Sequence, residues 1–300
     1  MKSNKKVKQR LKIKEFIIEK LLFIFAGISV LTTIAIVFTL FGETFLFFKE
    51  VSIVEFFTSS KWTPTLQPRN FGILPLFIGT MMIAFGSSII ALPLGLGSAI
   101  YLSEYAPRKV RKVIKPTLEV LAGIPSIVYG FFALTFITPL IRSILPQTQI
   151  FNAASASIAV GIMIIPMVAS LSEDAMMAVP DSIRQGAYAL GSTKLEVATK
   201  VIVPATKASI GAAFVLAISR AIGETMIVAI AAGQSPVLTL NPLESIQTMT
   251  GFMVNISMGD IQHGTIEYKT VFAVGALLFI ITFIMNLISR MIVKKGKEGY

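Results

Sequence analysis

The stretch that decides the fold lies in the second half of the chain and reads ASIGAAFVLAISRAIGETMIVAIAAG, from Ala208 to Gly233. A helix that spans a bilayer needs about 20 mostly apolar residues, and this stretch supplies them over Ser209–Ala232. The same stretch contains Arg220 and Glu224, one helical turn apart. Charges inside a spanning helix are costly, so the sequence predicts that these two residues face the interior of a helix bundle or a wet cavity.

Five further apolar runs and the composition agree with this prediction. Hydrophobic residues make up 54% of the 300 residues, charged residues make up 14%, and the mean hydropathy is +0.77. We therefore predict an all-α membrane protein with six transmembrane helices, of which the other five lie over Leu21–Phe41, Phe71–Tyr101, Thr117–Ile141, Ala153–Leu171 and Thr270–Val293. In the second run, Pro93 predicts the start of a short cytosolic extension.

The positions of lysine and arginine predict the orientation. With the N-terminus inside, cytoplasmic segments carry these residues in an excess of about four to one, as the positive-inside rule expects. Both termini are predicted to be cytoplasmic, in a multi-pass protein of the cell (plasma or inner) membrane. The net charge of +11 matches this topology and an anionic phospholipid surface, so nucleic acid is not needed to explain it. The basic segment before Leu21 is interpreted as part of a retained signal anchor.

The predicted organisation has three parts. Residues 1–70 hold the cytoplasmic N-terminus, the first transmembrane helix and an external loop. Residues 71–293 form a membrane domain with the other five predicted spans, and residues 294–300 form a cytoplasmic tail. Within this membrane domain, a long cytoplasmic loop lies at about 173–207 and a long external loop at 234–269.

Several kinds of chemistry are absent from the sequence. The chain has no cysteine and a single histidine, His263, so neither a zinc–thiolate site nor a metal cluster is expected. No G-x-x-x-x-G-K-[ST] motif occurs that could cradle ATP phosphates, and no nucleophile stands with a base. The chain is predicted not to be an enzyme, to have no catalytic residue and to bind no cofactor. If the chain moves a solute uphill, the energy must come from another chain or from an ion gradient.

The cytoplasmic loop reads SEDAMMAVPDSIRQGAYALGSTKLEVATKVIVPA, from Ser172 to Ala205. Asp181 or Ser182 is expected to cap a short helix after Pro180, and Gly191 is expected to end it. A second short helix, KLEVATKVIV, is expected to lie along the membrane before Pro204.

This loop resembles the cytoplasmic signature of the integral-membrane subunits of ABC importers, in which EAA is followed by three residues, Gly, nine residues and I-x-L-P. Gln185, Gly186 and Ala187 take the EAA positions, and Gly191 takes the glycine position. The final block is VIVP, which ends at Pro204. The first two EAA positions depart from the pattern, and Gln185 lacks the charge of a glutamate. The resemblance implies that the loop couples to an ATPase, and its candidate coupling residues are Ser182, Gln185, Gly186, Ala187, Leu190, Gly191 and Pro204.

Three other blocks resemble one subfamily, the C-type permease subunit of the Pst phosphate-specific importer. They are FGILPLFIGT (Phe71–Thr80), LAGIPSIVYG (Leu121–Gly130) and SRAIGETM (Ser219–Met226). The resemblance implies the type I ABC importer permease fold and a role as half of the pathway for inorganic phosphate. It also implies four kinds of partner: a second, A-type permease; two copies of a cytoplasmic ATPase subunit, which hold ATP and Mg; an extracytoplasmic phosphate-binding protein; and the phospholipid membrane.

Two interpretations of Arg220 and Glu224 remain open. Arg220 lies about 17 Å into its helix, near the middle of a bilayer core of about 30 Å. The two residues can form an ion pair that only joins helices, although Arg before Glu is the weaker order at this spacing. Alternatively, the guanidinium binds a phosphate oxyanion, while Glu224 holds the arginine when the cavity is empty.

Ser126 and Tyr129 are further candidates for the substrate pathway, on the third helix. The alternative for them is a proline kink at Pro125 with a hydroxyl bonded to its own backbone. Two other functions also remain open. One is an ABC permease for another oxyanion, such as molybdate or sulfate. The other is a secondary transporter that uses Glu224 for proton coupling, although no repeat of the kind such transporters contain is visible.

Overall fold

The computed structural model describes residues 2–259 and 261–297, with side chains for residues 14–259 and 261–294. The side chains of the basic residues expected at positions 2–12, and the end of the expected tail at 298–300, therefore lie outside the described residues. Within the described chain the regular elements are helices, apart from one antiparallel bridge between Trp62 and Phe71. The predicted all-α class is confirmed.

The elements follow in a fixed order along the chain, with three short π-helical segments labelled η. They are α1 (Lys2–Glu50), α2 (Ile53–Thr58), α3 (Leu74–Ile100), η1 (Tyr101–Tyr105), α4 (Arg108–Ala122), α5 (Ser126–Phe132), η2 (Ala133–Ile137), α6 (Thr138–Ile144), α7 (Ala153–Met177), α8 (Asp181–Ala189), α9 (Lys194–Glu196), η3 (Val197–Ile202), α10 (Val203–Ile222), α11 (Met226–Ala231), α12 (Met249–Met258) and α13 (Ile266–Lys297).

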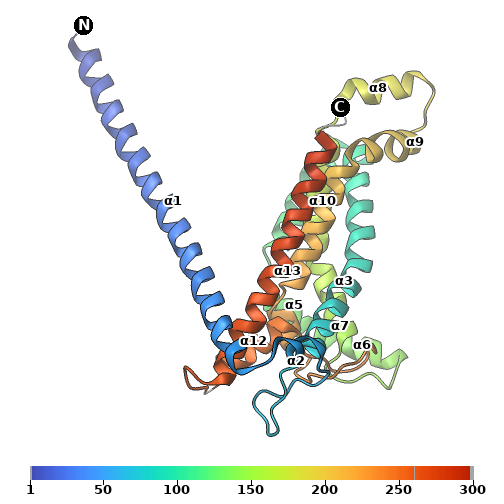
Figure 1. The fold of residues 1–300 in the computed structure, drawn as a ribbon. Helices are drawn as coiled ribbons and strands as arrows, with labels where there is room; N and C mark the ends of the chain where they lie inside the picture. The colour runs from blue at the N-terminus through green and yellow to red at the C-terminus, as the bar shows by residue number, and fades with distance from the viewer. Residues whose placement is uncertain (1, 260, 298–300) are drawn as a thin grey trace.

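Six helical segments of the described chain are long and apolar enough to cross a bilayer, which confirms the predicted number. The beginning of α1, the end of α13 and all of α8 lie at one end of the molecule, which we call the α8 end (Figure 1). The helices α2, α6 and α12 lie at the opposite end, the α12 end. The six segments are Lys14–Glu50, Leu74–Tyr105, Ser126–Ile144, Ala153–Met177, Lys194–Ile222 and Ile266–Lys294.

The centre of the bundle is the tight contact between α3 and α7. A Cβ atom added to Gly86 of α3 would lie 2.7 Å from Ser157 Oγ, and one added to Gly95 would lie 2.6 Å from Val168 Cβ. Small residues at such positions let two helices approach closely where lipid supplies no hydrophobic drive for association. The α10 helix packs on both members of this pair, and α13 packs on α10 (Figure 1).

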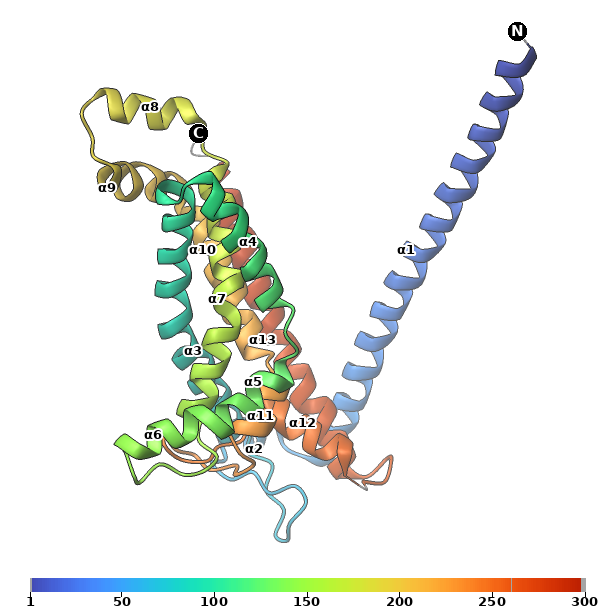
Figure 2. The same ribbon diagram turned by 180° about the vertical axis from the view of Figure 1, so that it is seen from behind.

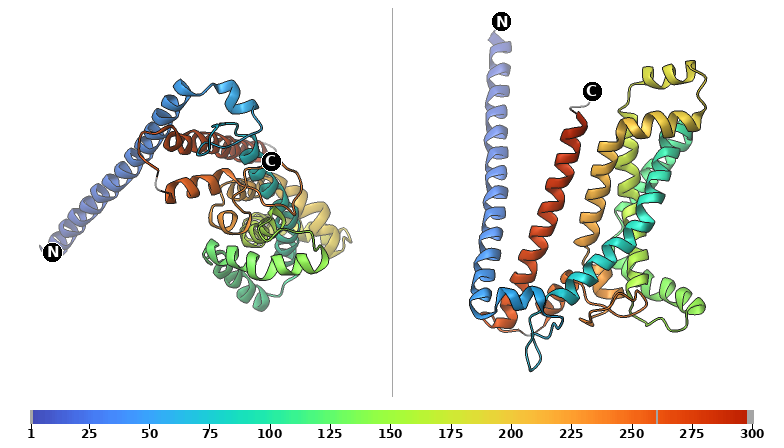
Figure 3. Two further views of the ribbon diagram at one scale, coloured as in Figure 1. Left: turned by 90° about the horizontal axis from the view of Figure 1, so that it is seen from below. Right: turned by 45° about the vertical axis from the view of Figure 1, so that its right-hand side comes forward.

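The first helix leaves the bundle at an angle. Only its end near the α12 end packs, where Phe47 is fully buried and Phe41 meets Phe279 edge to face (Figure 3). The preceding turns expose large apolar side chains such as Phe23 and Phe38. This surface is stable only against lipid or another apolar partner.

The third predicted helix, Thr117–Ile141, is wrong in its first part. α4 ends at Ala122 and α5 begins at Ser126, so two helices replace one. Pro125 disfavours helical backbone at the residue before it, and a glycine precedes that residue, so the GIP sequence breaks the helix. The apolar segment long enough to span begins only at Ser126.

Two other expectations have different outcomes. α3 passes through Pro93 and continues to Ile100, so the proline marks no break in the helix, and a cytosolic extension that begins there stays a prediction. A neighbouring helix can satisfy the carbonyl that a proline leaves free, which makes proline a weak signal inside a spanning helix. The fifth helix, expected to be continuous, ends at Ile222 and restarts at Met226.

Candidate functional site

The break in the fifth helix lies beside its two charged residues. Glu224 sits between the end of α10 and the start of α11. One of its carboxylate oxygens accepts the backbone N–H of Ile227 at 3.3 Å, and the other accepts from Arg220 Nη1 at 2.6 Å. The carboxylate thus satisfies an otherwise unpaired N–H in the first turn of α11 and also pairs with an arginine of α10.

The two partners of this pair differ in burial. Glu224 is 2% exposed, whereas the Arg220 side chain is 46% exposed. The interpretation of the two residues as neighbours on one continuous helix is wrong, because the helix ends between them. The pair bridges a helix end, with the carboxylate inside the protein and the guanidinium at an opening.

That opening is a pocket of about 290 Å³ where α4, α5, α7 and α10 meet. Among the residues that line it, only Arg220 is charged, and Ser126 contributes a hydroxyl. In a wall that is mostly apolar, a cation attracts an anion more strongly than it does in bulk water, because the local dielectric constant is lower. The other lining residues are Ala122, Ile124, Met163, Ile164 and Met167.

Arg220 has donors to spare. Among the described residues, the Glu224 carboxylate accepts from Nη1, and the Met163 sulfur lies 3.7 Å from Nη2 as a weak acceptor. A guanidinium carries five N–H donors in a planar fork that fits the oxygens of carboxylates and phosphates. The geometry therefore leaves room for an oxyanion in the pocket without loss of the Glu224 contact.

Of the other two candidates, the structure brings one to this pocket. Ser126 lines it at the start of α5. Tyr129 is 8% exposed, does not line it, and donates its hydroxyl hydrogen bond to the Leu121 carbonyl at 3.0 Å. Tyr129 thus ties α5 to the end of α4. A role of either residue in the substrate pathway stays a prediction.

The sequence analysis did not identify the two methionines that line the pocket, Met163 and Met167. Met163 and Met167 stand four residues apart on α7, so they share a face towards Arg220. That spacing was the available signal, but it is equally common on faces that pack only against other helices.

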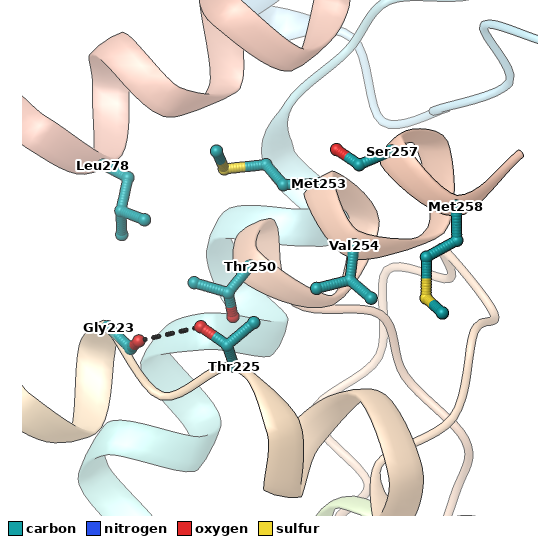
Figure 4. Close-up of a pocket in the computed structure, with 8 residues that line it drawn as sticks. All are labelled: Gly223, Thr225, Thr250, Met253, Val254, Ser257, Met258 and Leu278. Atoms are coloured by element: carbon teal, nitrogen blue, oxygen red, sulfur yellow. Dashed lines mark hydrogen bonds between the residues drawn. The ribbon is translucent and has the colours of Figure 1, made fainter. Parts of the chain in front are cut away.

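A second pocket, of about 360 Å³, lies on the α12 side of the break (Figure 4). Thr250 of α12 donates to the Glu224 carbonyl at 2.6 Å, and Thr225 donates to the Gly223 carbonyl at 3.2 Å. No charged side chain lines this pocket. It is therefore not a second oxyanion site, but it shows that α12 holds the backbone of the break.

The loop with the resemblance to a coupling signature projects from the α8 end. α8 stands away from the bundle, joined to it at both ends (Figures 1 and 3). Arg184 anchors its start, because Nη2 donates to the Met176 carbonyl at 2.7 Å and Nη1 to the Val179 carbonyl at 2.6 Å. The same side chain pairs with Glu104 of η1 at 3.2 Å.

The end of α8 is formed as expected and its start is not. Gly191 has φ +83°, and its N–H bonds the Tyr188 carbonyl, while the Ser192 N–H bonds the Ala187 carbonyl. These two bonds make a Schellman motif, which needs a residue like glycine at this position. At the start, Pro180 is the N-cap and no side chain caps the helix, so the expected cap from Asp181 or Ser182 is wrong.

The expected second short helix is also wrong as a separate element. The chain is helical without interruption from Lys194 to Ile222, through Pro204 in the first turn of α10. The π-helical segment η3 precedes the proline and provides the wider turn that accommodates it.

The candidate coupling residues lie mostly at the surface. Leu190 is 88% exposed, which is unusual for a large apolar side chain in a short loop, and Ala187 is half-buried. The others of the set are exposed: Ser182, Gln185, Gly186, Gly191 and Pro204. Whether they contact an ATPase stays a prediction.

An ion cluster that the sequence analysis did not find joins α4 to α7. Glu173 is completely buried and pairs with Arg111 and, at 2.7 Å, with Lys115. Lys115 also reaches Asp174 at 2.6 Å, and its hydrogen bonds to Asp174 and Glu173 raise the pKa of Lys115 above its ordinary value of 10.5. Two cations face two carboxylates, so this cluster is neutral.

Comparison with known proteins identifies relatives over most of the chain. The family model of the binding-protein-dependent transport system inner membrane component matches residues 91–297. A probable ABC transporter permease, YqgH of Bacillus subtilis, is 36% identical over 82% of this chain and 80% of its own length. The phosphate transport system permease protein PstC of Xylella fastidiosa is 32% identical over 82% of this chain and 81% of its own length.

Solved structures share the fold at low sequence identity. A chain of the alginate ABC transporter, solved with an alginate-bound periplasmic protein, has a TM-score of 0.65 at 13% identity, over 91% of this chain and 95% of that chain. A chain of the MetNI methionine ABC transporter in an inward-facing conformation has a TM-score of 0.57 at 17% identity, over 75% and 96%. The predicted type I ABC importer permease fold is confirmed.

Proposed function

The chain belongs to the family of binding-protein-dependent transport system inner membrane components, and from this membership we propose that it is the permease subunit of an ATP-driven importer of inorganic phosphate, of whose pathway it forms half. At the coarser level it is an ABC importer permease, a multi-pass protein of the cell membrane. Phosphate is the finer part of the proposal. The α8 end is taken to face the cytoplasm, which agrees with the lysine and arginine distribution.

The observation that carries the phosphate assignment is that Arg220 is partly exposed in a pocket and has N–H donors without a protein acceptor among the described residues. Its side chain is 46% exposed in an otherwise apolar pocket, and Glu224 is its sole carboxylate partner among the described residues. An oxyanion with several oxygens uses the donors that remain, in the bidentate manner that arginine favours. The PstC relatives at 30–33% identity support phosphate over other oxyanions.

ATP hydrolysis belongs, in this proposal, to two copies of a separate ATPase subunit, which bind ATP and Mg. The exposed α8, with Leu190 at its end, is the element that docks on them, and Arg184 passes their motion to α7 and η1. A second, related permease completes the pathway. An extracytoplasmic binding protein delivers phosphate at the α12 end. Relatives of known structure include one solved with a periplasmic binding protein, which supports partners of this kind.

Two alternatives make different predictions for the same residues. A permease for sulfate or molybdate would use the same pocket with another competitor profile. A secondary transporter would need a proton gradient and a Glu224 that changes its protonation. The first relative described above carries only the general name of a probable ABC transporter permease. Competition between oxyanions in an uptake assay decides between these substrates.

The test is uptake of radiolabelled phosphate by proteoliposomes that contain the assembled complex, with its binding protein and ATP. Wild type is compared with Arg220→Ala and with Arg290→Ala, in which the removed arginine is exposed and has no side-chain partner among the described residues. We expect ATP-dependent uptake that Arg220→Ala abolishes and Arg290→Ala retains, with uptake expressed per assembled complex because Arg220→Ala leaves the buried Glu224 carboxylate without its cation.

Competitors and energy sources separate the alternatives. Uptake that sulfate or molybdate blocks better than unlabelled phosphate would reassign the substrate. Uptake that needs a proton gradient and no ATP would contradict the importer mechanism. Equal uptake by Arg220→Ala and Arg290→Ala would reduce the central pair to a structural contact.

A further inference from the structure

The helix α4 connects the Arg220 pocket with the α8 end. It lies alongside α7 from the α8 end towards α5, outside the six apolar segments (Figure 2). At its inner end, Ala122 lines the Arg220 pocket. With a rise of 1.5 Å per residue, Lys112 lies about 15 Å and Arg108 about 21 Å from Ala122 along the helix axis.

The cations of α4 fall into two groups. Arg111 and Lys115 face α7 and are neutralised by Glu173 and Asp174. Arg108 and Lys112 lie on the exposed side, four residues apart and so on one face of the helix. Neither has a side-chain hydrogen bond or ion pair with any residue that the structure describes. The first group holds two helices together, whereas the second has charge to offer a ligand.

A hollow of about 450 Å³ lies over this exposed face. Its outer part is lined by Arg108, Arg111 and Lys112, of which Arg111 is already paired with Glu173. Its inner part is lined by the paired Lys115 and by Pro116 and Glu119. An anion is therefore attracted at the end near the α8 end, where two cations are unpaired, and repelled one to two turns deeper. All the lining residues belong to α4, so the hollow is open on its other side.

We propose that Arg108 and Lys112 of α4 form a binding station for a phosphate-type oxyanion at the cytoplasmic mouth of the pathway. The identification of the ligand class and of the cytoplasmic side rests on the proposed function. The station receives the anion after it has left Arg220, or binds the phosphate group of an anionic lipid at the same place. Both sources present the same tetrahedral group with charged oxygens, which suits arginine and lysine.

Topology alone does not account for this arrangement. A lysine that only sets orientation acts from any position in the loop, as Lys109 does from outside the hollow. Arg108 and Lys112 instead share one face, and neither pairs with a carboxylate of α7 as Arg111 and Lys115 do. The other end of the same helix lines the Arg220 pocket.

The test is binding of radiolabelled inorganic phosphate to the nucleotide-free, fully assembled complex in nanodiscs of phosphatidylcholine. Three variants are compared with wild type: Arg108→Gln/Lys112→Gln, Arg220→Ala, and the matched control Lys14→Gln/Lys109→Gln. The control removes the same charge from exposed residues that do not line the hollow. We expect the first variant to weaken one component of binding by about fivefold to tenfold, since each lost contact is exposed and partly screened.

Repeating the titration in nanodiscs that also contain phosphatidylglycerol distinguishes the two sources. If free phosphate is the ligand, the difference between the first variant and the control persists. If the headgroup occupies the station, the difference disappears there, and wild type retains more phosphatidylglycerol through purification than the variant does. Equal phosphate binding and equal lipid retention by variant and control would overturn the proposal.

Failure of this inference and failure of the proposed function give different results. Loss of the Arg220 component with no effect of Arg108→Gln/Lys112→Gln removes the station and leaves the central site. An effect of Arg108→Gln/Lys112→Gln with no Arg220 component leaves an anion site on α4 in a protein whose central arginine is structural.

Discussion

Two arginines of the chain, Arg184 and Arg220, differ in their burial and in how many of their N–H donors the protein uses. The Arg184 side chain is 12% exposed and donates to two backbone carbonyls and to Glu104, with Asp181 a further partner. The Arg220 side chain is 46% exposed and has one carboxylate and one sulfur for partners among the described residues. All the N–H donors of Arg184 have acceptors within the protein, whereas Arg220 has donors without an acceptor among the described residues.

The difference teaches how to separate a structural arginine from a ligand-binding one in a membrane protein. Burial of the carboxylate does not do so, because Glu104 and Glu224 both have side chains less than 5% exposed. The deciding quantity is how many of the five N–H donors the protein itself uses. Donors left over beside an apolar pocket are costly unless a ligand or water takes them, so their retention indicates a site.

The largest effect is expected when the central pair is replaced as a unit. Arg220→Met/Glu224→Gln keeps the volume, and it keeps an acceptor for the Ile227 N–H. The pair has one buried member, Glu224, and replacing such a pair by neutral residues of similar size is often neutral or stabilising. Phosphate uptake should fall by about a hundredfold or more, since two charge-assisted bonds to the oxyanion are lost.

The measurement pairs ATP-dependent uptake with thermal unfolding of the assembled complex. If the pair is only structural, uptake per assembled complex stays at the wild-type level, whatever the unfolding temperature.

Arg184→Met tests the other arginine. It leaves the Met176 and Val179 carbonyls without their donor and the buried Glu104 carboxylate without its cation. Breaking a buried pair costs about 3–5 kcal/mol, so the unfolding temperature should drop strongly and less ATPase should co-purify. Per assembled complex, phosphate binding at the central site should be unchanged. Arg290→Met is the control, and an equal unfolding temperature for the two variants would contradict the anchoring role.

Glu224→Gln alone is expected to have moderate effects, with tighter binding of phosphate and slower uptake. The amide keeps an acceptor for Ile227, but the negative charge beside Arg220 is gone. Phosphate should bind the nucleotide-free complex roughly tenfold more tightly, because a repulsive charge a few ångströms away is removed. Uptake should slow several-fold, because release becomes harder. Glu55→Gln, at an exposed position, is the control; weaker binding by Glu224→Gln would show that the carboxylate's main task is to orient the arginine.

The sequence predicted the helix number and the identity of the central residues because both depend on composition. A run of about 20 apolar residues forms a spanning helix in a bilayer. A charged residue inside such a run is costly, so it indicates a pairing or a functional role. The blocks around Gly191 and Ser219–Met226 also carry local information, and the glycine at the end of α8 has the positive φ that its position requires.

The breaks in the helices could not be predicted, because glycine and proline are ambiguous inside a spanning run. Gly95 and Pro93 lie within α3, while Gly223 and Pro125 stand at breaks. What decides is contact with distant parts of the chain. At the break in the fifth helix, Thr250 donates to the Glu224 carbonyl from 26 residues away, and the pattern of apolar residues in the sequence gives no sign of this contact.

Thr250→Val should have the smallest effect. Thr250 is 4% exposed, and its hydroxyl donates to the Glu224 carbonyl at 2.6 Å. Valine has the same shape without the donor, so the variant should lose about 1–2 kcal/mol of stability from a buried carbonyl left unpaired. Thr135→Val, which removes an exposed hydroxyl bonded within its own helix, should lose almost none.

The Thr250 variant also returns to the two arginines. Where α7 ends, Arg184 donates to the free carbonyls, whereas at the break after α10 Thr250 of α12 donates to the Glu224 carbonyl. If α12 keeps Arg220 available by holding Glu224 in place, phosphate binding in Thr250→Val weakens more than stability does. Phosphate binding that matches Thr135→Val, measured on equal amounts of assembled complex, would mean that α12 only fastens the break and has no part in keeping Arg220 available.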